Sequence, residues 1–378
     1  MSAQLTFYPL GNADTTLIRF ADNRLMLVDY ADMATDEKDD KRVDLPKELN
    51  NALYSARQKD FEVVCITHVD EDHIKGFSDY FELKSLISTQ DLDRPKIKEL
   101  WVPAEALTEQ NLKGDAEAVR KEARHRLRDG KDIKVFSRPE ALESFLNKHD
   151  LTIESRKDCI VDAGKYVPGY SKEGSEAVEF FVHCPFAWRA DDGLEDRNQN
   201  SIVFQATFVE GGYVTYALFG SDVDSETLDK IVQTTKRKNN EQRLEWDVLK
   251  LFHHCSYKAL DVDEKEREKK DKVLPVPNVK WLIETQGHDG AIIVSPSKPI
   301  PQKGTDEDKD KYPPHRQAAA YYKGVVRDKD GEFKVTMENP SKQSPKPLRI
   351  DITKFGAACD IIKPSAIGTA TSSESRGG

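Results

Sequence analysis

The chain has 378 residues, of which 33% are charged, and a net charge of −10. An acidic protein does not hold nucleic acid non-specifically, so polyanion binding would need a local basic patch or bound metal. The five cysteines are scattered, odd in number and without CxxC spacing, which excludes a disulfide framework and a zinc finger.

The N-terminal part of the chain predicts a small β-rich unit. Turn residues at 11–14 and 22–23 separate its first strands, and the apolar, β-branched run FEVVCIT is typical of a strand buried on both faces. The predicted elements are strands at 5–10, 15–20, 25–30 and 61–67, and a helix at 48–58.

A more polar, helix-like segment follows, and the strand pattern then resumes. We interpret residues 90–175 as a helical insertion, which includes the basic stretch Arg120–Arg128. Residues 1–355 would form one domain, with 365–378 as a disordered tail. The later predicted elements are strands at 177–183, 201–209, 213–219, 246–252, 279–285 and 291–295, and helices at 225–238 and 316–323.

Two features bear on location. No stretch approaches the ~18 apolar residues that a membrane helix needs. The N-terminus lacks the basic start and apolar run of a signal peptide. We therefore expect a cytoplasmic protein without a membrane partner.

The strongest chemical signal is the segment THVDEDH, residues 67–73. In an extended strand end, residues two apart point the same way, so His68 and Asp70 can share one metal ion. If the chain then turns, Asp72 and His73 can face a second ion. The alternative is an acidic turn whose aspartates cap the next helix.

Two later strand ends carry further ligand-type residues. Asp222 follows one predicted strand, and His253 and His254 end another. Taken alone, Asp222 could be a turn residue, and the histidine pair could be one core and one surface residue. Three strand ends that each deliver such residues indicate a site at one edge of a β-sandwich.

The whole series resembles the metal-binding residues of the metallo-β-lactamase superfamily. The closer likeness is to the stand-alone relatives of ComEC-type DNA-uptake hydrolase domains, which carry aspartate where most of the superfamily has the second histidine. The departures are Cys255 and Lys75 in place of glycines, and the absence of a transmembrane channel. Further segments that match this branch are 10–18, 27–29, 198–203 and 312–315.

The resemblance implies an αββα sandwich with a dinuclear metal centre. His68 and Asp70 would serve the first ion, while Asp72, His73 and one of His253 and His254 would serve the second. Asp222 would bridge both ions, and Asp29 would orient a ligand. Candidates for a further ligand or substrate contact are Asn200 and Ser256.

The implied activity is hydrolysis by a metal-bound hydroxide, since two divalent ions lower the pKa of a bridging water. Asp72, His254 and His315 are the predicted catalytic residues, the histidines as proton donors. Oxygen ligands around the first ion suit Mn²⁺ or Mg²⁺, and Zn²⁺ is the rival.

The leading substrate is a phosphodiester of nucleic acid or a nucleotide. One alternative is a small-molecule phosphoesterase or esterase. The other is a regulatory protein that keeps the hydrolase fold and binds a protein partner through residues 90–175. If a polynucleotide is bound, the stretch Arg120–Arg128 is the candidate to hold its backbone.

Overall fold

The computed structural model describes residues 2–86, 93–137, 139–170, 178–186, 200–263, 267 and 269–360. The predicted tail at 365–378 and residues 198–199 of the Asn-rich motif lie outside this part of the chain. No described helix is long and apolar enough to cross a membrane.

Two sheets form the centre of the molecule. In the described chain one sheet has nine strands in the order β15-β14-β1-β2-β3-β4-β5-β6-β7, and the other has six in the order β13-β12-β11-β10-β9-β8. The strands of the first sheet are β1 (Ala3–Phe7), β2 (Thr16–Arg19), β3 (Leu25–Val28), β4 (Phe61–Cys65), β5 (Ile97–Pro103), β6 (Ile133–Phe136), β7 (Ile160–Val161), β14 (Leu348–Thr353) and β15 (Gly356–Cys359). Those of the second are β8 (Val178–Cys184), β9 (Val203–Glu210), β10 (Tyr213–Phe219), β11 (Trp246–Lys250), β12 (Gly287–Ser295) and β13 (Glu332–Val335).

Helices cover the outer faces of both sheets. The α-helices are α1 (Leu45–Ala56), α2 (Glu71–Ile74), α3 (Phe77–Tyr80), α4 (Glu105–Thr108), α5 (Gly114–Asp129), α6 (Glu140–Asn147), α8 (Ser225–Arg237), α9 (Pro277–Glu284), α10 (Asp306–Lys309) and α11 (Arg316–Asp328). The 3₁₀ helices are η1 (Lys84–Leu86), η2 (Glu154–Cys159), η4 (Glu241–Leu244), η5 (His253–Cys255), η6 (Tyr257–Ala259) and η8 (Thr336–Glu338).

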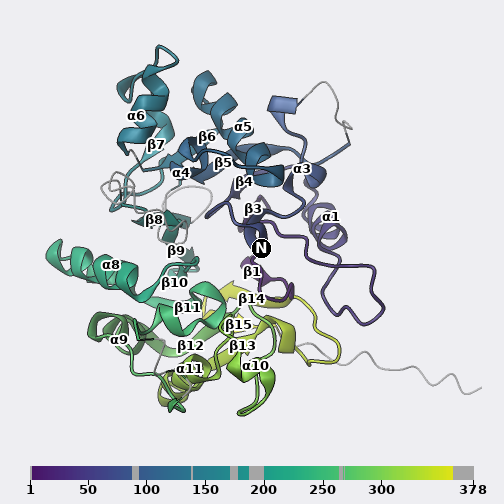
Figure 1. Cartoon of the computed structure of the whole chain (residues 1–378), viewed down its shortest axis with the longest axis vertical. Helices are drawn as coiled ribbons and strands as arrows, with labels where there is room; N and C mark the ends of the chain where they lie inside the picture. The colour runs from purple at the N-terminus through teal and green to yellow at the C-terminus, as the bar shows by residue number, and fades with distance from the viewer. Residues whose placement is uncertain are drawn as a thin grey trace, which may run out of the picture.

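Three apolar clusters account for the layers. One lies between the nine-stranded sheet and α1, α3, α4, α5 and α6, and another lies between the six-stranded sheet and α8, α9 and α11. The third fills the space between the two sheets. Figure 1 shows the two helical layers on opposite sides of the strands. The predicted αββα sandwich is confirmed.

Strand β4 illustrates why the sequence forms this architecture. Phe61 and Val64 pack toward the helices, while Val63 and Cys65 pack between the sheets. All four side chains are fully buried, as expected for a parallel strand covered on both faces. Its neighbours β3 and β5 run parallel to it.

Two predictions about secondary structure were wrong. The segment expected to be a helical insertion also contributes β5, β6 and β7 to the large sheet, because short apolar runs such as that around Trp101 lie between polar helices. Residues 279–285 form most of helix α9 rather than a strand. Pro277 occupies its first turn, and Val279, Leu282 and Ile283 are buried at helical spacing.

Candidate metal centre

The candidate ligands gather where parallel strands of both sheets end. Asp29 follows β3 and His68 follows β4 in one sheet, while Asp222 follows β10 and His254 follows β11 in the other. Carboxyl ends of parallel strands share one edge of their sheet, and this is where layered α/β proteins bind ligands. The loop between β1 and β2 reaches the same edge, because the Asp14 amide donates to the Asp72 carbonyl at 2.9 Å.

The backbone at two of these strand ends is strained. Asp29 has a φ of 59°, and the successive residues His253, His254 and Cys255 have φ values of 44°, 50° and 67°. Non-glycine residues enter this left-handed region at a cost, and such strain concentrates at functional sites.

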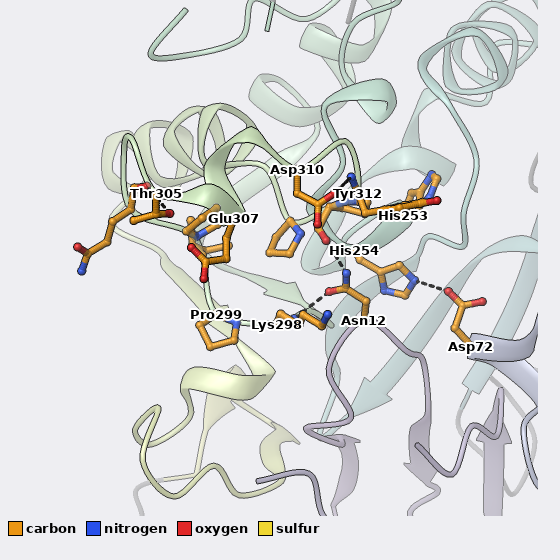
Figure 2. Close-up of a pocket in the computed structure, with 15 residues that line it drawn as sticks. Asn12, Asp72, His253, His254, Lys298, Pro299, Thr305, Glu307, Asp310 and Tyr312 are labelled. Carbon is orange, nitrogen blue, oxygen red and sulfur yellow. Dashed lines mark hydrogen bonds and ion pairs between the residues drawn. The ribbon is translucent and has the colours of Figure 1, made fainter. Parts of the chain in front are cut away.

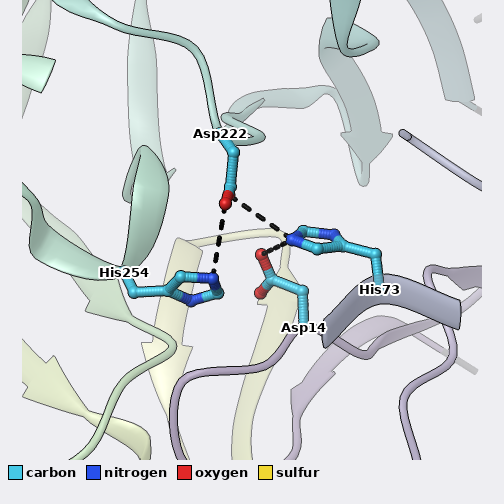
Figure 3. A group of neighbouring side chains, drawn as sticks. All are labelled: Asp14, His73, Asp222 and His254. Atoms are coloured by element: carbon cyan, nitrogen blue, oxygen red, sulfur yellow. Dashed lines mark ion pairs between the residues drawn. The ribbon is translucent and has the colours of Figure 1, made fainter. Parts of the chain in front are cut away.

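One group of four buried side chains meets at a single point. Asp14, His73, Asp222 and His254 each offer a ligand-type atom, and these atoms all lie within 4.8 Å of one another. His73 Nε2 is 3.4 Å from Asp222 Oδ1 and 3.8 Å from Asp14 Oδ2, and His254 Nε2 is 3.5 Å from Asp222 Oδ2. Figure 3 shows all four side chains directed into the same space.

A second group adjoins the first. His68, Asp72 and His73 offer ligand-type atoms within the same 4.8 Å limit, so His73 belongs to both groups. Asp72 Oδ2 lies 3.2 Å from His254 Nε2, which links the groups again. Asp70 lies further out, with Oδ2 3.9 Å from His68 Nε2 and a side chain that is 34% exposed.

Hydrogen bonds behind the histidines fix the direction in which each ring points. His73 Nδ1 lies 2.8 Å from Asp29 Oδ2, and His254 Nδ1 lies 2.8 Å from the Pro296 carbonyl. Because these oxygens accept, each ring donates from Nδ1 and directs its Nε2 atom toward the cluster. Asp29, which the sequence predicts to orient a ligand, is the residue that accepts from His73.

His68 and Asp29 are held by a shared hydroxyl network. Ser221 Oγ donates to Thr67 Oγ1 at 2.8 Å and can accept the Nδ1 proton of His68 at 3.2 Å. Thr67 in turn donates to Asp29 from its amide at 2.7 Å and from its hydroxyl at 2.8 Å.

Several ligand-type atoms at this point are buried without a partner. Within the described residues, His68 Nε2, His73 Nε2, Asp14 Oδ1 and Asp222 Oδ1 have no hydrogen bond. Buried polar atoms normally find partners, so such a concentration needs an explanation. A set of imidazole nitrogens and carboxylate oxygens fits divalent metal ions such as Zn²⁺ or Mn²⁺.

The electrostatics of the cluster also favour a bound cation. Burial would lower the pKa of His73, but the Asp29 and Asp222 carboxylates outweigh it and raise this pKa well above its usual value. Burial would also lower the pKa of His254, but the Asp222 and Asp72 carboxylates raise it well above its usual value. Asp222 itself has its pKa held far below normal by His254 and His73 against the effect of burial.

Two residues of this centre were missed by the sequence reasoning. Asp14 was read as part of a turn, and Lys250 as part of an apolar strand. The Lys250 ammonium is 1% exposed and donates to Asp14 Oδ2 at 2.6 Å and to the Gly220 carbonyl at 2.9 Å. A lysine inside a buried strand requires an anionic partner, which is the signal that could have revealed the pair.

The remaining predicted site residues lie around this centre. His253 is partly exposed, with Nε2 3.8 Å from Asp222 Oδ2, and Asn200 is buried with Oδ1 unpartnered among the described residues. Ser256 accepts from the Lys258 amide at the start of η6, and its predicted ligand or substrate contact stays a prediction.

His315 does not have the position of a proton donor. Its Nδ1 accepts from the Tyr257 amide at 2.8 Å, and the residue is buried at the start of α11. Burial lowers its pKa to about 4, so the ring is neutral at neutral pH. These contacts give His315 a structural position, and they do not support its predicted role as a proton donor.

Three arginines of the basic stretch make contacts within the protein. In α5, Arg126 is buried against Glu122 at 2.7 Å, and Arg120 and Arg124 donate to the carbonyls of Glu109 and Leu107. Arg120 and Arg124 thereby tie α5 to the end of α4, and Arg126 ties it to β5. The predicted phosphate-binding role of the whole stretch stays a prediction, because Lys121 and Arg128 are exposed.

Comparisons with known proteins add little beyond these observations. No family model and no curated protein matches the chain. A diphosphatase of the PhnP family is similar over 66% of this chain and 73% of its own, with 9% identity and a TM-score of 0.25. A subclass B3 metallo-β-lactamase of Bradyrhizobium japonicum is similar over 84% of this chain and 85% of its own, with 12% identity and a TM-score of 0.27.

Proposed function

We propose that the chain is a metal-dependent hydrolase of the metallo-β-lactamase superfamily with a dinuclear centre. The observation that carries this proposal is the convergence of unpartnered, buried ligand atoms from His68, His73, Asp14 and Asp222. A purely structural polar cluster would satisfy these atoms internally. His73 can bind only one ion, through Nε2, and the neighbouring His68 and Asp72 would supply ligands for a second.

The chain's own residues have distinct roles in this proposal. His73, Asp14, Asp222 and His254 would hold one ion, while His68, Asp72 and Asp70 would hold the other. When bound, two divalent ions lower the pKa of a coordinated water and polarise the scissile group. His253, at the exposed edge, is the residue that would protonate a leaving group.

The favoured reaction is hydrolysis of a phosphodiester, with nucleic acid or a nucleotide as the substrate. The resemblance of the ligand series to the ComEC-like branch supports this choice. The charge of the site supports it as well. Lys250 neutralises the Asp14 carboxylate, so this carboxylate would not reduce the positive charge with which two divalent ions attract an anionic phosphate. A regulatory role through a partner is the rival, and the complete set of ligand-type atoms speaks against it.

Hydrolysis of a nitrophenyl phosphodiester by metal-stripped and reconstituted protein tests the proposal. Asp72→Ala and His73→Ala should abolish activity and lower bound metal while circular dichroism stays unchanged. His288→Ala, a change at a partly exposed histidine paired with Asp247, is the matched control and should retain both. Full activity in either ligand variant would contradict the assignment.

The identity of the ions can be tested with the same assay. Asp70 places an oxygen near His68, and oxygen ligands favour Mn²⁺ over Zn²⁺. We expect more activity with Mn²⁺ than with Zn²⁺, and Asp70→His should move the preference toward Zn²⁺. A Zn²⁺ preference that the substitution leaves unchanged would refute the proposed role of Asp70.

A further inference from the structure

The cavity beside the metal centre points to the size and shape of the substrate. We propose that it binds a compact phosphodiester with one planar organic group, the size of a nucleotide, and that it disfavours a polynucleotide strand. This inference rests on the proposed function and narrows its substrate class.

The cavity has a volume of about 660 Å³ and opens directly onto the metal centre. Asp72, His253 and His254 line one end, and Thr305 and Glu307 line the opposite end, as Figure 2 shows. Pockets that enclose single small ligands have about 300–1,000 Å³. A phosphate at the metal end would thus leave room for one organic group.

The wall of the cavity suits a flat, apolar group. Tyr312 lines it and is 62% exposed, and Ile300 lines it from the other end of the same loop. Exposed tyrosine rings stack on nucleobases and other aromatic groups, a contact that contributes about 1–3 kcal/mol per base. The prolines of this wall are Pro299, Pro301, Pro313 and Pro314.

The charges around the cavity disfavour a chain of phosphates. Lys298 lines it as a cation, but the exposed carboxylates of Glu307 and Asp310 line it too. Among the described residues neither carboxylate has an ion-pair partner. A polynucleotide would bring a further negative charge at every nucleotide past them, whereas a single diester needs to place only one charge, at the metal end.

The wall and the metal centre are tied together by one short loop. Asn12 Oδ1 accepts from the Lys298 amide at 3.0 Å, and Asn12 Nδ2 donates to the Pro313 carbonyl. Both ends of the segment 298–313 are therefore fixed to the loop that carries Asp14. The Tyr312 side of the cavity is thus linked through Asn12 to the loop that carries Asp14.

The test compares two substrates on metal-reconstituted, full-length protein. Thymidine 5′-p-nitrophenyl phosphate is the compact diester, and a single-stranded oligothymidylate is the polymer. We expect kcat/KM for the compact diester to exceed kcat/KM for the polymer, expressed per phosphodiester bond, by roughly tenfold or more. Tyr312→Ala should raise its KM by about tenfold, in keeping with the loss of one stacking contact.

One further double variant and two controls separate stacking from charge. Glu307→Gln combined with Asp310→Asn should raise activity on the polymer relative to the compact diester. Tyr54→Ala, which removes an 86% exposed ring on α1, and Asp328→Asn combined with Asp330→Asn, at exposed positions around the end of α11, are the matched controls and should change neither substrate. Calorimetric binding of thymidine 5′-phosphate should weaken about tenfold in Tyr312→Ala.

The outcomes distinguish this inference from the proposed function. Cleavage of both substrates with an equal or greater rate on the polymer would overturn the inference and leave the hydrolase intact. An unchanged KM and unchanged thymidine 5′-phosphate affinity in Tyr312→Ala would also overturn it. Loss of activity on every phosphodiester by protein that binds its metal ions would overturn both.

Discussion

Replacing Lys250 with methionine tests whether Asp14 belongs to the metal centre. Methionine is similar in length to lysine but carries no charge, so the variant leaves the Asp14 carboxylate buried without its closest cation. Both side chains of the pair are almost fully buried, at 1% and 2% exposure. The hydrogen bond from Lys250 to the Gly220 carbonyl is lost as well.

The expected cost follows from this burial. Removal of one partner from a buried ion pair destabilises a protein by about 3–5 kcal/mol. With an unfolding entropy of about 2 cal/mol/K per residue, this corresponds to a fall in Tm of roughly 4–6 °C for the metal-free chain. A bound divalent ion replaces the missing positive charge beside Asp14, so the loss should fall by half or more in the metal-loaded protein.

Two measurements must then agree. Thermal unfolding with and without Mn²⁺ gives the stability that Lys250→Met loses in each state. The difference between the two losses must equal the gain in metal affinity of the variant over the wild type, tenfold for each 1.4 kcal/mol. Lys98→Met is the control, because this half-exposed lysine pairs with Glu62 at 2.9 Å on the surface. Lys98→Met should lower the free energy of unfolding by about 0–1 kcal/mol, with or without metal. Equal losses for Lys250→Met in both states, with unchanged metal affinity, would refute a place for Asp14 beside the ion.

Three further predictions follow from single contacts. Asp29→Asn removes the carboxylate that holds His73 Nδ1 and should weaken metal binding by about 10–100-fold in a metal titration, and wild-type affinity would contradict that role. Gly220→Ala would place a Cβ 2.4 Å from the Phe252 ring, so unfolding should show a loss of about 1–3 kcal/mol together with weaker metal binding, whereas a variant as stable as the wild type would exclude the clash. Burial lowers the pKa of His183 to about 4, below its unfolded value near 6.5, so its stabilisation is present above pH 6.5 and is lost toward pH 4. Between pH 7 and pH 4 the free energy of unfolding of the wild type should fall by about 3 kcal/mol more than that of His183→Gln. Parallel pH profiles of stability would disprove this.

The parts of the site that could be predicted from the sequence are those next to strong apolar runs. β4 and β11 are continuous buried strands, and His68 and the pair His253–His254 follow them directly. A polar residue that comes just after such a strand lies at the edge of a sheet, regardless of how the rest of the chain folds. Its location can therefore be inferred from the neighbouring sequence alone.

Asp14 and Lys250 could not be placed by this reasoning, because their roles depend on contacts distant in sequence. Asp14 reaches the centre when its loop packs on α2 and its amide bonds the Asp72 carbonyl. Similarly, β5, β6 and β7 are short strands separated by polar helices, so the average composition of the segment concealed them.

The count of metal ions per chain tests the central claim most directly. Metal-stripped protein, reconstituted with Mn²⁺ and dialysed, can be analysed by plasma mass spectrometry beside Asp222→Ala and the control His288→Ala. Two ions per chain in the wild type and in the control, and one or fewer in Asp222→Ala, is the predicted result. A wild-type chain that retains fewer than two ions, or an Asp222→Ala variant that retains as many as the wild type, would contradict the dinuclear centre.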